Sequence, residues 1–566
     1  MTTTTAHQPF WQRWHDWQWC AIIALVVLAA FAVGYNYAFM MDWDDATFVV
    51  NNQHLEWNWA NLRDYFTHPF LELYTPVPMV SLMIDHALFG LNPIGYHLHN
   101  ILLHLACALL LYAILRELGL NRGIATIGAL LWALSPQKVE SVIWIAERKD
   151  VDCGLFAFAS FLCFQHALKR LDTPCKCLLL QLAAGLLGML SIWSKPATVA
   201  LPGVFIVYAI LYGGRTGRAA AKPVPFHLSP TKETGHSPSH LSPLTSALFP
   251  CFLTLLAIAV SQHFTQTGVG HLEKLWAIPL HNLFWYPLSA LYPWCLNPIH
   301  VPIRAWHDIW GVIVAGVLAT GGLLALARWR KIPWRTILCA ALIIGGATVP
   351  VLGLLRYTDY THCDRYNYCV SAVVWAVVLL LLNQLPWRKT WWLPTALTLL
   401  VGVFFLRTWC YLPYWETSDT FVAYIFLQPG VPNRKSYQMG INATLRTKNF
   451  PLLAVIRERM RTQPPPEGIY STPPEDAPGR ILDAHLACVS ENLMDAQQIY
   501  QGVQQRSLAL REKYVIPTEL TQIMYRDLYH IHQQLGNLDA VQFYLKQLEK
   551  VNEYHSRQNA DFPIGE

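Results

Sequence analysis

Two adjacent acidic residues, Asp44 and Asp45, follow the first long apolar segment of the chain, in the run Met41-Asp-Trp-Asp-Asp45. Acidic side chains so close to hydrocarbon are costly, and they are generally kept there for function. A carboxylate at a membrane surface can take a proton as a general base, or it can bind a cation. This pair is therefore the main candidate for catalysis, and the sequence leaves open which of the two aspartates acts.

Four basic residues lie beside the ends of later apolar segments: Arg148, Lys149, Lys195 and Arg365. Arg and Lys side chains bind phosphate through charge-assisted hydrogen bonds. A phosphate that leaves during a transfer reaction is stabilised by such cations and needs no general acid. We therefore expect these four side chains to bind the phosphate of a substrate. Charged helix caps, snorkelling and structural ion pairs are the alternative roles.

Six further polar residues occur near these cations and are expected to support the site: Glu140, Glu147, His97, His99, His104 and Asp364. His97 and His104 fall two turns apart on one helical face and could bind a metal. No third ligand stands at a fixed spacing, so hydrogen bonding between helices is the commoner role. A divalent cation, Mg²⁺ or Mn²⁺, remains open as a cofactor, with Asp44 or Asp45 as its ligand.

The composition indicates a membrane protein. The chain has 566 residues, of which 54% are hydrophobic and 14% are charged, whereas a soluble chain carries roughly 25% charged residues. The net charge of +5 is small, so the sequence gives no indication of nucleic acid binding. The 13 cysteines lie largely within apolar runs, where they behave as small hydrophobic residues. The sequence therefore predicts an all-α polytopic membrane protein.

Eleven segments are apolar enough to cross a bilayer. Another segment, 281–296, contains Pro287 and Pro293 and is expected to be re-entrant or interfacial. The expected spans are about 19–39, 96–115, 123–136, 151–168, 178–193, 196–213, 245–262, 309–328, 336–354, 367–384 and 391–409.

The distribution of charge predicts the orientation of these spans. Alternate loops are rich in Lys and Arg and poor in acids, and such loops are cytoplasmic. The N-terminus is then cytoplasmic, without a cleaved signal, and the C-terminal segment is periplasmic. We expect an integral protein, with the bacterial inner membrane as its location. The outer loops include 40–95, 137–150, 263–308 and 355–366, and Lys195 lies in a tight outer turn between the spans 178–193 and 196–213. All the candidate site residues thus fall on the outer side.

Two domains are expected, a membrane domain at 1–410 and a soluble helical domain at 411–566. The membrane domain contains a long outer loop at 40–95 and a Pro- and Ser-rich cytoplasmic linker at 214–245. In the soluble domain, segments 491–500 and 536–544 share an Asp-Ala pair and a later Tyr. This pattern is typical of tetratricopeptide (TPR) hairpins, although an ordinary helical bundle remains an alternative.

The motifs together resemble GT-C-fold membrane glycosyltransferases, in particular the transmembrane-and-TPR-containing O-mannosyltransferase-like group. The resemblance covers roughly 20–440 and is densest over 40–205. The most specific motif is Val139-Glu-Ser-Val-Ile-Trp-Ile-Ala-Glu-Arg-Lys-Asp150. Other shared motifs are Gly90-Leu-Asn-Pro93, Tyr96-His-Leu-His-Asn100, Ser194-Lys-Pro196 and Asp364-Arg-Tyr366.

This resemblance implies an inverting transfer of a sugar from a polyprenyl- or dolichyl-phosphate donor to a hydroxyl of a protein or glycan, at the outer face. It implies that Asp44 or Asp45 is the general base or a metal ligand. It places Glu147, Arg148, Lys195 and Arg365 around the donor phosphate. The chain departs from the family pattern at Ser135, where a His is usual.

Two other classes of function remain as alternatives. A non-catalytic assembly protein would use the membrane domain to anchor an outer helical-repeat module. A transporter would place charged groups near the middle of the bilayer, whereas the charges of this sequence lie at the outer ends of the spans.

Overall fold

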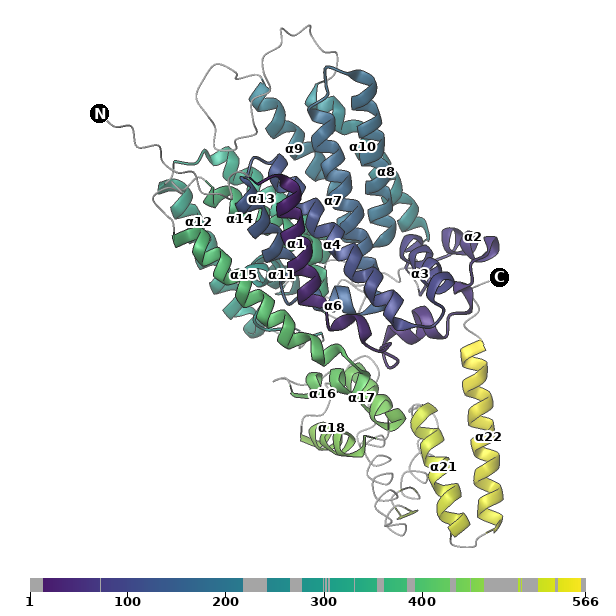
Figure 1. The fold of residues 1–566 in the computed structure, drawn as a ribbon. Helices are drawn as coiled ribbons and strands as arrows, with labels where there is room; N and C mark the ends of the chain where they lie inside the picture. Colours follow the sequence, from purple (N-terminus) through teal and green to yellow (C-terminus); the bar gives the residue numbers. More distant parts are fainter. Residues whose placement is uncertain are drawn as a thin grey trace, which may run out of the picture. The chain divides into compact units, whose positions relative to one another are not determined.

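The computed structural model describes residues 14–216, 242–264, 277–353, 361–383, 392–427, 434–462, 497–500, 518–534 and 538–560, apart from 72, 299, 301–302, 304–305, 330, 448 and 499. The described residues are helical, with a single antiparallel bridge between Phe70 and Leu73. The all-α prediction is therefore confirmed for this part of the chain (Figure 1).

Seven helices of the described residues are long and apolar enough to cross a membrane. They span Pro93–Glu117, Ile145–Leu168, Pro174–Ser194, Pro243–Phe264, His307–Trp329, Asp364–Leu382 and Trp392–Trp415. Shorter apolar helices span Asp16–Phe31, Pro76–Phe89, Arg122–Ala133, Pro196–Tyr212 and Thr336–Val351. The protein is thus a polytopic membrane protein, with fewer full-length spans than the eleven expected from hydropathy.

Every expected span nevertheless coincides with a helix. These helices are α1 (Asp16–Phe31), α4 (Pro93–Glu117), α5 (Arg122–Ala133), α7 (Arg148–Leu168), α8 (Pro174–Ser194), α9 (Leu201–Thr216), α10 (Pro243–Phe264), α12 (Trp310–Trp329), α13 (Trp334–Thr348), α14 (Asn367–Leu382) and α15 (Trp392–Tyr411). Helix α1 ends earlier than the expected residue 39, and a short 3₁₀ turn at Gly34–Asn36 follows it. The segment with two prolines forms α11 (Ala277–Leu291), which continues through Pro287.

The expected outer loop 40–95 contains more helix than the sequence pattern suggested. It holds a π-helical turn at Ala46–Val50, α2 (Trp59–Thr67) and α3 (Pro76–Phe89). Pro76 opens α3 at a position where a missing N–H costs nothing. Beyond it, apolar residues continue to Phe89 and surround a single buried acid, Asp85.

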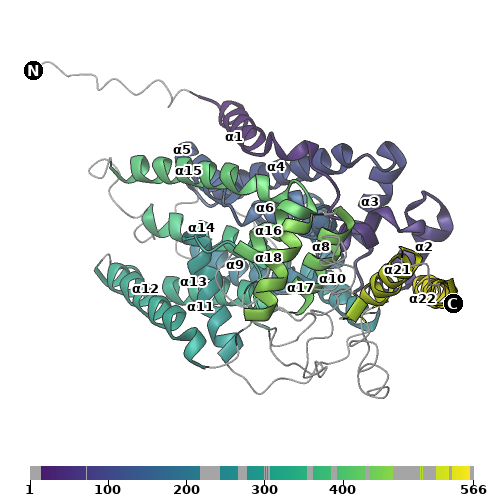
Figure 2. The same ribbon diagram turned by 90° about the horizontal axis from the view of Figure 1, so that it is seen from below.

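Helices α7 and α8 form the centre of the membrane domain. Helix α7 packs against α4 and α8, and α10 packs against α8 and α9. A Cβ atom on Gly188 would lie 2.6 Å from the Thr254 side chain, so α8 and α10 approach closely there because glycine has no side chain. Helices α11, α12 and α13 gather beside α14, as Figures 1 and 2 show.

Three short elements connect the long helices near the candidate site. Helix α6 (Lys138–Ile143) and a 3₁₀ turn at Ile145–Glu147 precede α7. A second 3₁₀ turn, Pro196–Thr198, follows α8, and a third, Asp364–Tyr366, leads into α14. These turns lie at the ends of the long helices, where backbone N–H and C=O groups lack partners within the helix and polar side chains can gather.

The chain divides into two compact units, residues 1–40 with 44–417, and residues 41–43 with 418–566. The second unit contains α16 (Ser418–Leu427), α17 (Arg434–Thr447), α18 (Phe450–Thr462), α21 (Thr518–Gln534) and α22 (Leu538–Ala560). Helices α21 and α22 pack as a hairpin, in which Tyr544 stacks on His532. Most of the first repeat segment and of the 214–245 linker lies outside the described residues.

Candidate functional site

Asp45 is a fully buried carboxylate that links the first outer loop to the segment before α7. Its Oδ2 accepts the backbone N–H of Met40 at 2.9 Å, and its Oδ1 accepts the N–H of Ala146 at 2.8 Å. Burial raises the pKa of Asp45 to about 7, against the effect of these two N–H donors. The residue therefore positions the backbone, and both of its oxygens are already used.

The raised pKa of Asp45 predicts a pH-dependent stability. Its unfolded pKa is about 4, so the folded state retains a proton that the unfolded chain has already released between about pH 4 and 7. The stability that protonated Asp45 contributes at low pH is therefore lost as the pH rises from about 4 to about 7. We expect Asp45→Asn to remove this loss, so that the melting temperature of the variant relative to wild type is higher at pH 8 than at pH 5. Thermal unfolding of the purified chain at both pH values tests this, and an equal difference at both would contradict it.

Asp44, the neighbour of Asp45, is half-buried and differently placed. Within the described ranges its carboxylate has neither a hydrogen bond nor an ion pair. The hydrogen bond between Asp45 and Ala146 holds the two aspartates beside the segment that carries Glu147. The structure thus distinguishes a buried carboxylate, whose two oxygens both accept hydrogen bonds, from a more accessible one that has no partner among the described residues.

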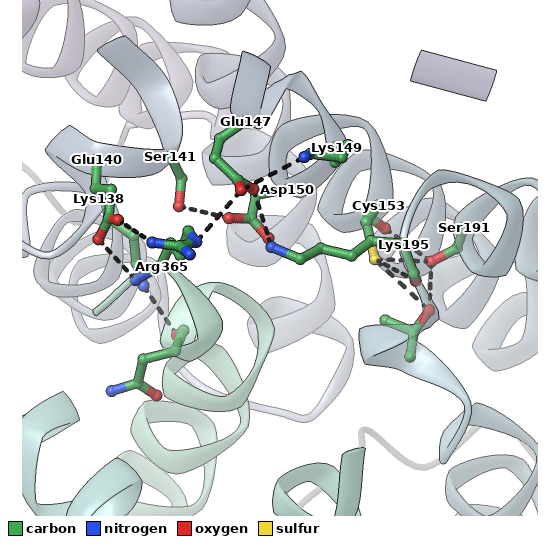
Figure 3. Close-up of polar contacts among 12 residues, drawn as sticks. Lys138, Glu140, Ser141, Glu147, Lys149, Asp150, Cys153, Ser191, Lys195 and Arg365 are labelled. Carbon is green, nitrogen blue, oxygen red and sulfur yellow. Dashed lines mark hydrogen bonds and ion pairs between the residues drawn. The ribbon is translucent and has the colours of Figure 1, made fainter. Parts of the chain in front are cut away.

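Three cations converge on the carboxylate of Glu147 (Figure 3). The Nζ of Lys195 lies 2.9 Å from Oε2, while Oε1 lies 3.3 Å from the Nε of Arg365 and 3.6 Å from the Nζ of Lys149. Glu147, Arg365 and Lys149 are all more than nine-tenths buried. Three of the four basic residues expected to bind phosphate are therefore brought together from α7, from the turn after α8 and from the turn before α14.

Lys195 bridges two carboxylates. Its Nζ also donates to Asp150 Oδ1 at 2.7 Å, and Asp150 accepts a second hydrogen bond from the Ser141 hydroxyl at 2.9 Å. Burial acts to lower the pKa of Lys195, but Asp150 and Glu147 raise it above its usual range. The amine is therefore a permanent cation, and it lies 5.0 Å from the centre of the Tyr366 ring.

Glu140 and Asp364 surround Arg365. Glu140 accepts the Nη1–H of Arg365 at 2.5 Å and its backbone N–H at 3.1 Å. Burial raises the pKa of Glu140 to about 8, although the charge of Arg365 opposes this shift. Asp364 accepts a hydrogen bond from the Gln137 amide at 3.0 Å, and its Oδ1 lies 3.3 Å from His300 Nε2. Sequence reasoning identified Glu140 and Asp364 but missed Gln137, the hydrogen-bond partner of Asp364.

Arg148 belongs to a different cluster from the other three cations. Its guanidinium is fully buried and lies 2.5 Å from the carboxylate of Asp85 on α3. It also donates to Ser81 and bonds to Asn100, and His99 lies 2.6 Å from Asp85. Adjacent residues on a helix point about 100° apart, so Arg148 and Lys149 reach different sides of α7. In the sequence, Asp85 could have revealed this cluster, because it is an acidic residue within an apolar segment.

His97 and His104 are buried along α4. Neither forms a hydrogen bond or ion pair with the cations around Glu147 in the part of the chain that the structure describes. His104 bonds to the Tyr368 hydroxyl at 2.8 Å and to the carbonyl oxygen of Ala133 at 3.0 Å. It therefore joins three helices, which agrees with the interhelical role weighed for these histidines. His97 is 1% exposed.

Within the part of the chain that the structure describes, no group of three or more His, Cys, Asp or Glu residues could hold a metal ion. Magnesium is commonly held by one or two carboxylates together with substrate phosphates. Asp44 is a carboxylate of this kind, whereas Asp45 already accepts two backbone hydrogen bonds. Of the two aspartates expected as possible ligands, Asp44 is therefore the one whose carboxylate is not occupied by hydrogen bonds among the described residues.

An apolar cavity of about 260 Å³ lies among α4, α7, α9, α13 and α14. Ala197 and Thr198, two and three residues after Lys195, line it, and Cys369 lines it four residues after Arg365. Elsewhere its walls are mainly aliphatic and aromatic, including Phe158, Ile343 and Ala376. Residues close in sequence to Lys195 and Arg365 therefore line a space suited to a hydrocarbon chain.

No family model matches the chain. The human protein O-mannosyl-transferase TMTC1 is 24% identical over 343 residues, which are 53% of this chain and 37% of that protein. Human TMTC4 is 28% identical over 186 residues, covering 29% of this chain and 24% of the relative. Human TMTC2 is 34% identical over 139 residues, which are 23% of this chain and 16% of that protein. The matches thus span well under half the length of these relatives.

Among solved structures, the chain is similar to the archaeal oligosaccharyltransferase AglB from Archaeoglobus fulgidus, in complex with an inhibitory peptide and a dolichol-phosphate. The identity is 14%, the TM-score is 0.40, and the match covers 83% of this chain and 62% of AglB. Several animal TMTC proteins match the chain in sequence, and the evolutionary relationship is inferred from these matches. The chain is a distant homologue of the TMTC protein O-mannosyl-transferases.

Proposed function

We propose that this protein is a GT-C-type glycosyltransferase that takes a sugar from a polyprenyl-phosphate donor and transfers it to a hydroxyl group. The observation that carries the proposal is an apolar cavity lined by Thr198 and Cys369, which follow Lys195 and Arg365 closely in the sequence. A lipid-linked phosphate needs a hydrocarbon-binding space with cations at its polar end. The distant homology to protein O-mannosyl-transferases supports mannose as the sugar and a protein hydroxyl as the acceptor.

In this reaction Asp44 is the general base. A Ser, Thr or sugar hydroxyl is a weak nucleophile until its proton is removed. Asp44 takes that proton while the oxygen attacks the anomeric carbon, and the bond from that carbon to the phosphate oxygen breaks. Attack opposite to the leaving phosphate inverts the configuration. Lys195, Arg365 and Lys149 stabilise the negative charge that develops on the phosphate.

Asp45 and Arg148 have positioning roles in the proposal. Asp45 holds the backbone of Ala146, next to Glu147, and Arg148 joins the start of α7 to Asp85 on α3. Both contacts fix the turn that carries Glu147 and Lys149. We therefore assign the catalytic role to Asp44 and a structural role to Asp45.

The site faces the periplasm in this proposal. The eleven expected spans and the Lys- and Arg-rich loops support a cytoplasmic N-terminus and a periplasmic C-terminal domain at 411–566. Helix pairs such as α21 and α22 often bind protein segments. The helices of that domain are proposed to bind the acceptor protein.

Filling the cavity tests the lipid-binding part of the proposal. Ala376 on α14 lines the cavity, and Ala376→Trp would occupy the space of the lipid chain. We expect the KM for a long-chain polyprenyl-phosphate sugar to rise at least about tenfold, which corresponds to ~1.4 kcal/mol of lost binding. The release of polyprenyl phosphate from the donor, with membrane proteins as acceptors, provides the assay.

Ala315→Trp is the matched control, since Ala315 is exposed on α12 and does not line the cavity. Its KM should equal that of wild type. An unchanged KM in Ala376→Trp, with a normal melting temperature, would show that the lipid chain binds elsewhere.

A further inference from the structure

The carboxylate of Glu147 differs from its acidic neighbours in the partners that hold it. Asp150 accepts a hydrogen bond from the Ser141 hydroxyl, and Glu140 accepts one from the backbone N–H of Arg365. The contacts of the Glu147 carboxylate with described residues are all with cations, namely Lys149, Lys195 and Arg365. These are the groups that would also bind a phosphate.

The contacts of Glu147 are divided between its two carboxylate oxygens, and the contact with Lys195 is a hydrogen bond. One carboxylate oxygen faces Lys195 at 2.9 Å, and the other faces Arg365 at 3.3 Å and Lys149 at 3.6 Å. The two oxygens of a carboxylate and the two non-ester oxygens of a phosphodiester both bind Arg and Lys in this manner. Glu147 and a phosphate therefore require the same donors.

The charges of the cluster also indicate that Glu147 and a phosphate would compete for the same cations. Three cations, Lys149, Lys195 and Arg365, face three carboxylates, Glu140, Glu147 and Asp150. A phosphodiester would bring a further negative charge to the cations that Glu147 already contacts. Two anions on the same cations repel each other, and withdrawal of the Glu147 carboxylate relieves that repulsion.

Building on the proposed function, we propose that Glu147 is an internal competitor of the donor phosphate, which gives up Lys195 and Arg365 when the phosphate binds and takes them back when it leaves. The exchange lowers the affinity for both donor and product. After transfer, the polyprenyl phosphate product is more negative than the donor, and it would bind this cluster strongly. The returning carboxylate of Glu147 promotes its release.

The test measures the binding of polyprenyl phosphate to the full chain in lipid nanodiscs. We expect Glu147→Gln to bind polyprenyl phosphate about tenfold more tightly than wild type. Its kcat for transfer should fall severalfold because the product leaves more slowly, and its KM for the donor should also fall. Polyprenol, which lacks the phosphate, should bind wild type and variant equally, and inorganic phosphate should show whether the gain needs the lipid.

Two further variants support this test. Glu147→Asp keeps the charge but shortens the side chain, so it should show a smaller gain, and it guards against failure of the Gln variant to fold. Glu117→Gln alters another carboxylate–lysine pair, that with Lys169. Neither residue lines the cavity or contacts Glu147, so the variant should leave binding unchanged.

The outcomes separate this inference from the proposed function. If Glu147→Gln is folded and binds polyprenyl phosphate no more tightly than wild type, while Lys195→Gln binds it more weakly, Glu147 is only a structural partner of the cations. If wild type does not bind polyprenyl phosphate at all, the proposed function itself is wrong. An equal gain for polyprenol would also contradict the inference, because the effect would then not concern the phosphate.

Discussion

Asp44→Asn is expected to lower the rate of sugar transfer by about 10²- to 10⁴-fold, the usual contribution of a general base. The amide cannot take the proton of the acceptor hydroxyl. The donor KM and the melting temperature should change little, because Asp44 is half-buried and has no hydrogen bond or ion pair among the described residues. The release of polyprenyl phosphate from the donor, measured for the purified protein, provides the rate.

Asp42→Asn is the control for this prediction. Asp42 lies two positions before Asp44 and pairs with Arg446 in the C-terminal unit. Its substitution should leave the rate near that of wild type. Full activity in Asp44→Asn, combined with loss of activity in a folded Asp45→Asn protein, would reverse the roles of the two aspartates.

Lys195→Gln is expected to affect both stability and donor binding. The amine bridges two buried carboxylates at 2.9 and 2.7 Å, and removing one partner of a buried ion pair costs about 3–5 kcal/mol of folding stability. In addition, we expect the KM for the donor to rise at least about 100-fold, since one of the cations proposed to bind the donor phosphate is lost. Thermal unfolding and donor titration, both in nanodiscs, measure the two effects.

Two companion variants separate stability from binding. Lys195→Arg keeps the charge and should recover part of the donor affinity. Lys195→Gln combined with Asp150→Asn removes the carboxylate left without its partner, so it should recover stability but not donor affinity. A normal donor KM in folded Lys195→Gln would exclude Lys195 from the phosphate site.

The sequence predicted the helices well because each apolar segment is long enough to be helical in a membrane. It was wrong where the local backbone, not hydropathy, sets the start or the end of a helix. The stretch around Pro76 was expected to lie in the long outer loop 40–95, yet Pro76 starts α3, since proline is well tolerated in the first helical turn. The end of α1 was placed too late because hydropathy does not register the 3₁₀ turn that begins at Gly34.

The candidate site was predicted in part. Residue types and outer positions were enough to select Lys149, Lys195 and Arg365, which the structure brings to Glu147. They could not separate Arg148 from Lys149, because that distinction depends on which side of α7 each residue faces and on Asp85 in another helix. Nor could they distinguish Asp44 from Asp45, since the difference arises from backbone N–H groups at Met40 and Ala146.

The most direct test of the account is to locate a bound polyprenyl phosphate by photo-crosslinking. A lipid with a diazirine in its isoprenoid chain would be bound to the full protein in nanodiscs, irradiated and mapped by mass spectrometry. We predict crosslinks to cavity residues such as Thr198, Ile343 and Ala376, reduced in Lys195→Gln and competed by unlabelled polyprenyl phosphate but not by polyprenol at the same concentration. Crosslinks confined to exposed residues of α12, such as Val314 and Leu318, and unchanged in Lys195→Gln, would contradict the account.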